Sequence, residues 1–131
     1  MHRLLGHTAD LRAELSAPDF ATLCAEAVDL VREVLVGPSE VVAREERRVH
    51  LEGEEEAERF FRFVRELIYL ADVDGFLPST CSPDDGAVIV SGEPFDPLRH
   101  QSERQVKALT RHRYLYERTT EGLRAELIFD L

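Results

Sequence analysis

The chain lacks the short motifs that mark the commonest enzyme classes. It has only two cysteines, Cys24 and Cys81, in dissimilar contexts without a CxxC pair, and its five histidines show no zinc-ligand spacing. No GxSxG, P-loop or GxGxxG sequence is present. The sequence therefore gives no support for a tetrahedral zinc site, a serine nucleophile or a nucleotide-binding loop. Cys24 lies in the apolar stripe of a predicted helix, so we expect a reduced thiol in the core.

Lysine is almost absent as well. Fifteen of the sixteen basic residues are arginine, and Lys107 is the only lysine. A compositional bias toward arginine explains the fifteen but not the exception. Lysine is a compact point charge without the planar fork of arginine, so the two are not always interchangeable. Lys107 is therefore either a chance survivor on a solvated strand face or a residue kept for its chemistry.

Length and composition indicate one folded domain that spans residues 1–131. The apolar fraction of 44% excludes intrinsic disorder despite a charged fraction of 32%. At 131 residues the chain is long enough to bury a core without disulfides or metals. No apolar stretch approaches the length of a membrane span. We expect a soluble, cytoplasmic protein with no membrane partner.

The charge balance points toward a protein partner. The formal net charge is −10 and the pI is near 4.9. Such a surface repels a phosphate backbone, and no basic stripe with interleaved aromatic residues stands out. Direct contact with nucleic acid is therefore disfavoured. A basic protein partner fits better, because complementary fields steer association.

Two amphipathic helices are the clearest local predictions. Apolar residues recur at i, i+3, i+4 and i+7 over residues 20–35 and again over residues 57–71. Pro18 and Asp19 suit the start of the first helix, and Gly37-Pro38 suits its end. Asp72, Asp74 and Gly75 are expected in the loop after the second helix.

The remaining segments are predicted as strands. They cover residues 11–15, an exposed and interrupted stretch at 41–51, residues 76–81 and 87–91, and a C-terminal hairpin of 106–118 with 123–131. The predicted class is α+β, with two helices packed on an antiparallel or mixed sheet. A regular hairpin would pair Glu117 with Arg124, place His112 on the core face and set Arg111 opposite Asp130.

Acidic residues stand at the start of the first predicted strand and at the end of the last. Asp10 precedes the first strand, and Asp130 is followed only by Leu131 with its α-carboxylate. If the termini meet, three acidic groups would form an oxygen cluster suited to a hard divalent cation. The alternatives are that both aspartates cap solvent-exposed strand ends, or that Asp130 forms a cross-strand ion pair with Arg111.

Four motifs in order resemble one known family. They are His7-Thr8-Ala9-Asp10; Gly92-Glu93-Pro94-Phe95-Asp96 with His100 four residues on; residues 106–112, which read VKALTRH; and Ile128-Phe129-Asp130-Leu131. Each motif alone is weak, but their order and spacing over the whole chain resemble archease. The chain departs from the usual family pattern at Gly6, Cys24, Gln105 and Arg111.

The resemblance implies a function and a set of site residues. Archease is the protein cofactor of the RNA-splicing ligase that joins a 2′,3′-cyclic phosphate end to a 5′-hydroxyl end in tRNA splicing or RNA repair. By this resemblance, Asp10, Asp130 and Leu131 would hold a divalent metal ion, with calcium or magnesium favoured over zinc. Lys107, His7 and His100 would contact the ligase, although a turn-stabilising role is about as plausible for His100. RNA would be met only through the ligase.

Two other function classes remain open at this point. A stand-alone metal-dependent phosphoester hydrolase could use the same two aspartates, but the acidic surface and the missing base and nucleophile motifs oppose it. A metal-free, chaperone-like binding domain would require an extended exposed apolar groove, for which the sequence gives no evidence.

Overall fold

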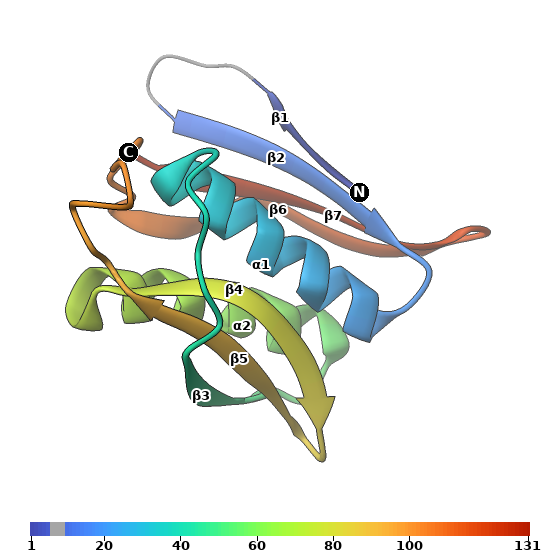
Figure 1. Cartoon of the computed structure of the whole chain (residues 1–131). Helices are drawn as coiled ribbons and strands as arrows, with labels where there is room; N and C mark the ends of the chain where they lie inside the picture. Colours follow the sequence, from blue (N-terminus) through green and yellow to red (C-terminus); the bar gives the residue numbers. More distant parts are fainter. Residues whose placement is uncertain (6–9) are drawn as a thin grey trace.

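The computed structural model describes residues 1–5 and 10–131, which form a single α+β domain of two helices and seven strands (Figure 1). The strands belong to two separate antiparallel sheets with the orders β1-β2-β7-β6 and β3-β5-β4. Both helices pack between these sheets. The predicted fold class is thus confirmed, and within the described residues no helix has the length and hydropathy needed to cross a membrane.

Helix α1 (Phe20–Val36) forms where the apolar spacing predicts it. Asp19 caps its start by accepting a hydrogen bond from the Thr22 amide at 2.8 Å. Gly37 ends it at a positive φ of 57°, with its amide bonded to the Glu33 carbonyl. Its buried face includes Leu23, so the helix is held by packing as much as by its caps.

Helix α2 (Glu56–Asp74) is longer than its sequence pattern predicts. Asp72 and Asp74, expected in a loop, lie in its last turn. The helix continues until Gly75, which adopts the left-handed conformation and bonds its amide to the Leu70 carbonyl. The apolar stripe ends earlier because the last turn of the helix is exposed to solvent. The end of the helix is therefore indicated by Gly75 and not by the last apolar residue of the stripe.

The four-stranded sheet brings the two chain ends together. Strand β2 (Asp10–Ala17) pairs on one edge with β1 (His2–Leu5) and on the other with β7 (Gly122–Asp130), and β7 pairs in turn with β6 (Ala108–Thr119). The sequence pattern did not predict β1. It also did not predict the direct pairing of β2 with β7, which lie more than a hundred positions apart.

The three-stranded sheet lies on the other side of the helices (Figure 1). It consists of β3 (Glu45–His50), β5 (Ala87–Pro94) and β4 (Phe76–Asp84). Gly92 is required where β5 passes β4, because a Cβ atom there would lie 1.9 Å from the Leu77 carbonyl oxygen. This close approach explains the glycine in the Gly92-Glu93-Pro94 sequence.

A large bulge in β6 changes the register of the C-terminal hairpin. Next to the turn, Glu117 pairs with Arg124 as predicted, but the register shifts between Leu115 and Thr110. Leu115 faces Glu126 and Thr110 faces Ile128, so four residues of β6 lie opposite one residue of β7. The bulge contains Arg113 at a positive φ of 59°.

Because of the bulge, an apolar residue of β6 occupies the core position at which a regular hairpin would place a polar one. Leu109, and not His112, lies opposite Phe129, and Leu109 is buried while His112 is exposed. The predicted core position of His112 is therefore wrong. The physical reason is that the extra residues let the sheet bury leucine, which carries no polar group to desolvate.

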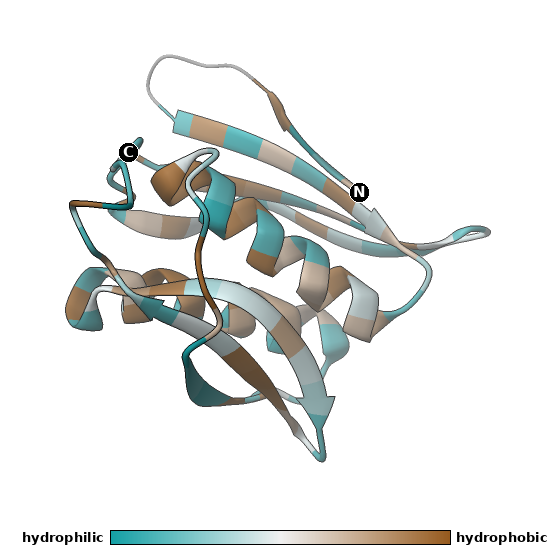
Figure 2. Ribbon diagram, in the orientation of Figure 1, coloured by the Kyte–Doolittle hydropathy of each residue, from teal (hydrophilic) through white to brown (hydrophobic). Residues whose placement is uncertain are grey.

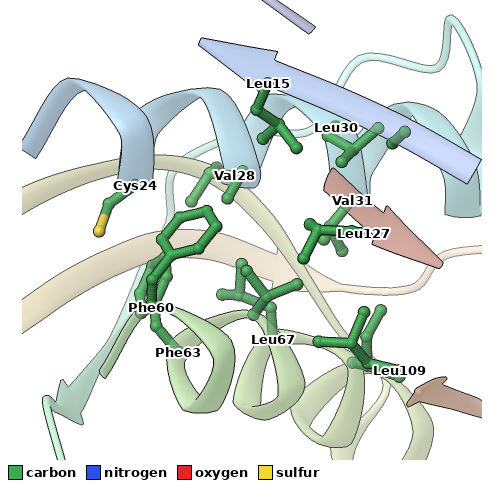
Figure 3. Packing of buried hydrophobic residues seen from close by; sticks show 14 of the residues in the cluster. Leu15, Cys24, Val28, Leu30, Val31, Phe60, Phe63, Leu67, Leu109 and Leu127 are labelled. Atoms are coloured by element: carbon green, nitrogen blue, oxygen red, sulfur yellow. The ribbon is translucent and has the colours of Figure 1, made fainter. Parts of the chain in front are cut away.

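One large hydrophobic cluster joins the two sheets through the helices between them, and a small second cluster consists of Val36, Val41 and Leu77. In Figure 3, Phe60, Phe63 and Leu67 of α2 reach toward α1, and Leu109 and Leu127 of the four-stranded sheet close the same space. Figure 2 shows apolar and polar residues alternating along β2 and around α1, as expected for elements with one buried face. Cys24 lies in this core, and its pKa is raised by burial, which agrees with the expected reduced thiol.

Candidate functional site

The two terminal aspartates are direct cross-strand neighbours. Asp10 opens β2, Asp130 closes β7, and the strand register sets their Cα atoms opposite each other. Residues in such a pair project to the same side of the sheet with Cβ atoms about 4.5–5.5 Å apart. Leu11 and Phe129, next in each strand, are buried, so the aspartates point to the opposite side from the core. Asp130 is exposed and Asp10 half-buried.

Lys107 is anchored beside this pair through its backbone. Its amide donates a 2.8 Å hydrogen bond to the Asp130 carbonyl oxygen, which extends the hairpin pairing one residue beyond β6. The Lys107 side chain is exposed, whereas Val106 before it is buried. Leu131 packs partly against the core next to Asp130. The structure thus brings together four of the six predicted site residues: Asp10, Asp130, Leu131 and Lys107.

The electrostatics of the pair suit a shared cation. Like charges placed directly opposite in an antiparallel sheet repel each other. The nearby arginines are engaged elsewhere, Arg12 with Glu126 at 3.8 Å and Arg111 with Glu58 at 2.5 Å. Among the described residues, no group of three or more His, Cys, Asp or Glu side chains could hold a metal. A cation would therefore take two side-chain carboxylates and complete its shell with the terminal carboxylate, water or a partner's oxygens, as magnesium commonly does.

The alternative ion pair between Asp130 and Arg111 is not formed. Because of the bulge in β6, Ala108 and not Arg111 faces Asp130. Arg111 instead lies over the Phe61 ring at 4.2 Å and bonds Glu58, which lowers the pKa of that carboxyl. The bulge thus leaves Asp130 without the neutralising neighbour that a regular hairpin would give it.

His100 lies inside the protein and holds a turn. It is 4% exposed, and its Nδ1 accepts a 2.8 Å hydrogen bond from the Asp96 amide. Its Nε2 therefore carries the proton and donates to a Glu93 carboxylate oxygen at 3.2 Å. A ring engaged at both nitrogens and buried in this way matches the turn-stabilising role. Its expected direct contact with a partner does not fit this placement.

Glu93 is the centre of this buried network. The carboxylate is 1% exposed and accepts hydrogen bonds from the Arg99 guanidinium and, at 2.6 Å, from the Val42 amide. Bonding to Arg99 outweighs burial and lowers the pKa of Glu93 to about 2. Sequence reasoning missed this role, although an acid within an apolar strand with arginine six positions later is a signal that could have found it. His7, the remaining predicted site residue, lies outside the described residues.

Comparison with known proteins decides the family. The sequence pattern of the Archease protein family matches residues 2–131. The chain belongs to the archease family. The archease of Pyrococcus furiosus is 31% identical over 95% of this chain and 94% of its own length. The archease of Thermotoga maritima is 28% identical over 99% of each chain.

Solved structures agree with the archease assignment. A crystal structure described as an archease and possible chaperone, from Thermotoga maritima, is similar with a TM-score of 0.70 and 26% identity, covering 100% of this chain and 98% of that one. The solution structure of protein 1598 of Methanobacterium thermoautotrophicum has the same fold, with a TM-score of 0.78 over 99% and 98% of the two chains. Its identity is 23%, so it supports the fold alone.

Proposed function

We propose that this archease-family chain is a non-enzymatic protein cofactor of an RNA-splicing ligase. It would promote transfer of GMP onto the active-site histidine of the ligase and so support multiple turnovers in tRNA splicing or RNA repair. The observation that carries the proposal is the cross-strand pairing of Asp10 with Asp130, with Lys107 bonded to the backbone of Asp130. Three charged groups gathered at one edge of the sheet suit the presentation of charge to a partner's site.

Asp10, Asp130 and the Leu131 carboxylate are the groups that would hold a divalent cation. Bound there, the cation would supply neutralisation of phosphate charge, which is what metal ions contribute in GTP-dependent sites. The chain's own residues would orient this charge, since Asp10 and Asp130 are fixed by the strand register. The acidic surface, with a net charge of −10, would favour a ligase that is basic around its RNA groove.

Asp130→Asn tests the proposed role directly. The substitution removes one charge of a repelling pair, so we expect the melting temperature to stay the same or rise slightly. Binding of a calcium or magnesium ion, measured by calorimetry on the purified protein, should weaken at least about tenfold. Guanylylation of the cognate ligase at limiting ligase should fall in parallel.

Glu121→Gln is the matched control, because it removes an exposed carboxylate in the hairpin turn at the other end of β7. An Asp130→Asn protein that binds metal and stimulates the ligase like wild type would refute the proposed role of this aspartate pair. Metal-dependent hydrolysis of GTP or of a generic phosphoester by the chain alone would favour the hydrolase alternative instead.

A chaperone-like role without metal is the second candidate. It is favoured by the description of the Thermotoga maritima structure as a possible chaperone and by the exposed apolar side chains Tyr69, Val73, Phe95 and Leu98. Such a protein would stimulate its partner equally well with Asp130 replaced. The same Asp130→Asn assay therefore separates the two candidates.

A further inference from the structure

An apolar groove lies beside the aspartate pair, at the C-terminal ends of both helices. Figure 1 shows these helix ends and the segment between β5 and β6 on the same side of the molecule as the C-terminus. The groove has a volume of about 290 Å³, and its floor is made by the buried residues Val36, Ile68, Leu77 and Val106. This volume lies at the lower end of the roughly 300–1,000 Å³ of typical small-molecule sites. A groove of this size also accommodates one or two side chains of a partner.

One apolar side chain continues the groove onto the surface. Phe95 lines it, is 40% exposed, and is fixed to the end of α2 by a 2.7 Å bond from its amide to the Gly75 carbonyl. On α2, Ile68, Ala71 and Asp72 form the groove wall that faces it. A large apolar side chain exposed at the rim of an apolar groove is typical of a protein interaction surface.

The charge around the groove selects a cationic partner group. Neither helix has a basic residue in its last turn, and α2 ends with Asp72 and Asp74. The C-terminal end of a helix carries partial negative charge and unpaired carbonyl groups, so two carboxylates there add to an already negative end. Asp72 and Arg104 are the charged residues of the groove wall, and Asp74 lies two residues beyond Asp72 in the same last turn of α2.

We propose that this groove docks a basic, apolar-flanked segment of the partner ligase. An apolar side chain would enter the cavity next to Phe95, and a neighbouring arginine or lysine would bind Asp72 and Asp74. This rests on the proposed function, which supplies the partner. Val106 lines the groove and Lys107 bonds Asp130, so docking here would fix the aspartate pair at a set position on the ligase.

The double variant Asp72→Lys, Asp74→Lys gives the sharpest test. Lysines at the C-terminal end of a helix are favourable, so the isolated protein should melt at the same or a slightly higher temperature. Binding to the cognate ligase, measured by calorimetry or interferometry, should weaken at least about tenfold. Weaker binding at an unchanged or higher melting temperature would indicate a lost interface contact, because a damaged fold would also melt at a lower temperature.

Glu46→Lys, Glu121→Lys is the control of equal charge change, because both residues are exposed and lie outside the groove. It should bind nearly as tightly as wild type. Phe95→Ser tests the apolar wall of the groove without changing charge. It should weaken binding several-fold, with the melting temperature measured in parallel.

Three outcomes would overturn the inference. If wild type binds and stimulates the ligase but the Asp72, Asp74 variant binds as tightly as its control, the groove is not the docking site and the proposed function stands. If wild type neither binds nor stimulates the ligase, the proposed function fails and the assigned partner with it. If sedimentation shows a dimer of this chain that Phe95→Ser dissociates, the groove is occupied by a second copy.

Discussion

Lys107 shows how one residue can be tied to the fold through its backbone and leave its side chain free. Its amide bonds the Asp130 carbonyl, whereas its ammonium group is exposed. The fold therefore depends on the main chain at this position and hardly on the side chain. The prediction that the single lysine serves a partner and not the fold is consistent with this placement.

Lys107→Ala should change stability by less than about 0.5 kcal/mol, because exposed substitutions are usually mild. The same change should reduce stimulation of the cognate ligase, and Lys107→Arg should restore it only in part because the compact ammonium is lost. A ligation time course at limiting ligase, with melting temperatures in parallel, measures both effects. Full stimulation by a stable Lys107→Ala protein would show that the single lysine is an accident of composition.

Glu93 gives the protein a predictable response to acid. Its pKa in the folded protein is about 2, against an ordinary value of 4.5, so its contribution to stability is complete above about pH 4.5 and is lost as the pH falls toward 2. Glu93→Gln should lower the melting temperature at pH 7 by about 5–10 °C, because Arg99 and the Val42 amide lose their charged acceptor.

The difference in melting temperature between Glu93→Gln and wild type should shrink as the pH is lowered from about 5 to about 2. Circular dichroism melts across that range measure it. Glu121→Gln serves as the comparison, since that exposed side chain has no place in the network. A gap that stays constant down to pH 2 would contradict the assignment of this stability to the ionised carboxylate.

At the scale of elements, helices were predicted better than strands, and the reason is physical. The stripe of α1 is set by local spacing, and its caps lie within a few residues, so the predicted residues 20–35 nearly match Phe20–Val36. Strand register depends on partners elsewhere in the chain. The bulge in β6 follows from the fit of Leu109 against Phe129, which no local pattern shows.

Phe60 connects the two helices and the four-stranded sheet at one point. It is fully buried, with its ring 6.3 Å from Phe20 of α1 and 5.8 Å from Tyr116 of β6 between ring centres. Phe60→Ala should therefore destabilise the protein by about 3–5 kcal/mol. Urea unfolding measures this, with the exposed Tyr69→Ala on the same helix expected to cost far less.

At the scale of the whole molecule, composition and motif order were sufficient for the class, the single domain and the family. They could not supply the division into two sheets or the strand β1. The meeting of Asp10 with Asp130 was expected from the resemblance, but it depends on the pairing of β2 with β7 across the length of the chain. The Glu93 network escaped prediction because burial of an acid is decided by its neighbours in space.

Because of the bulge, the two ends of β6 pair with β7 independently of how many residues lie between them. Residues 108–110 are held against β7 by their own pairing, and residues 115–119 are held independently by the pairs next to the turn. Between them, residues 111–114 lie opposite a single residue of β7, so these residues are not paired one to one with residues of the neighbouring strand. A residue could therefore be inserted or deleted in this stretch while the pairing of residues 108–110 keeps Lys107 beside Asp130.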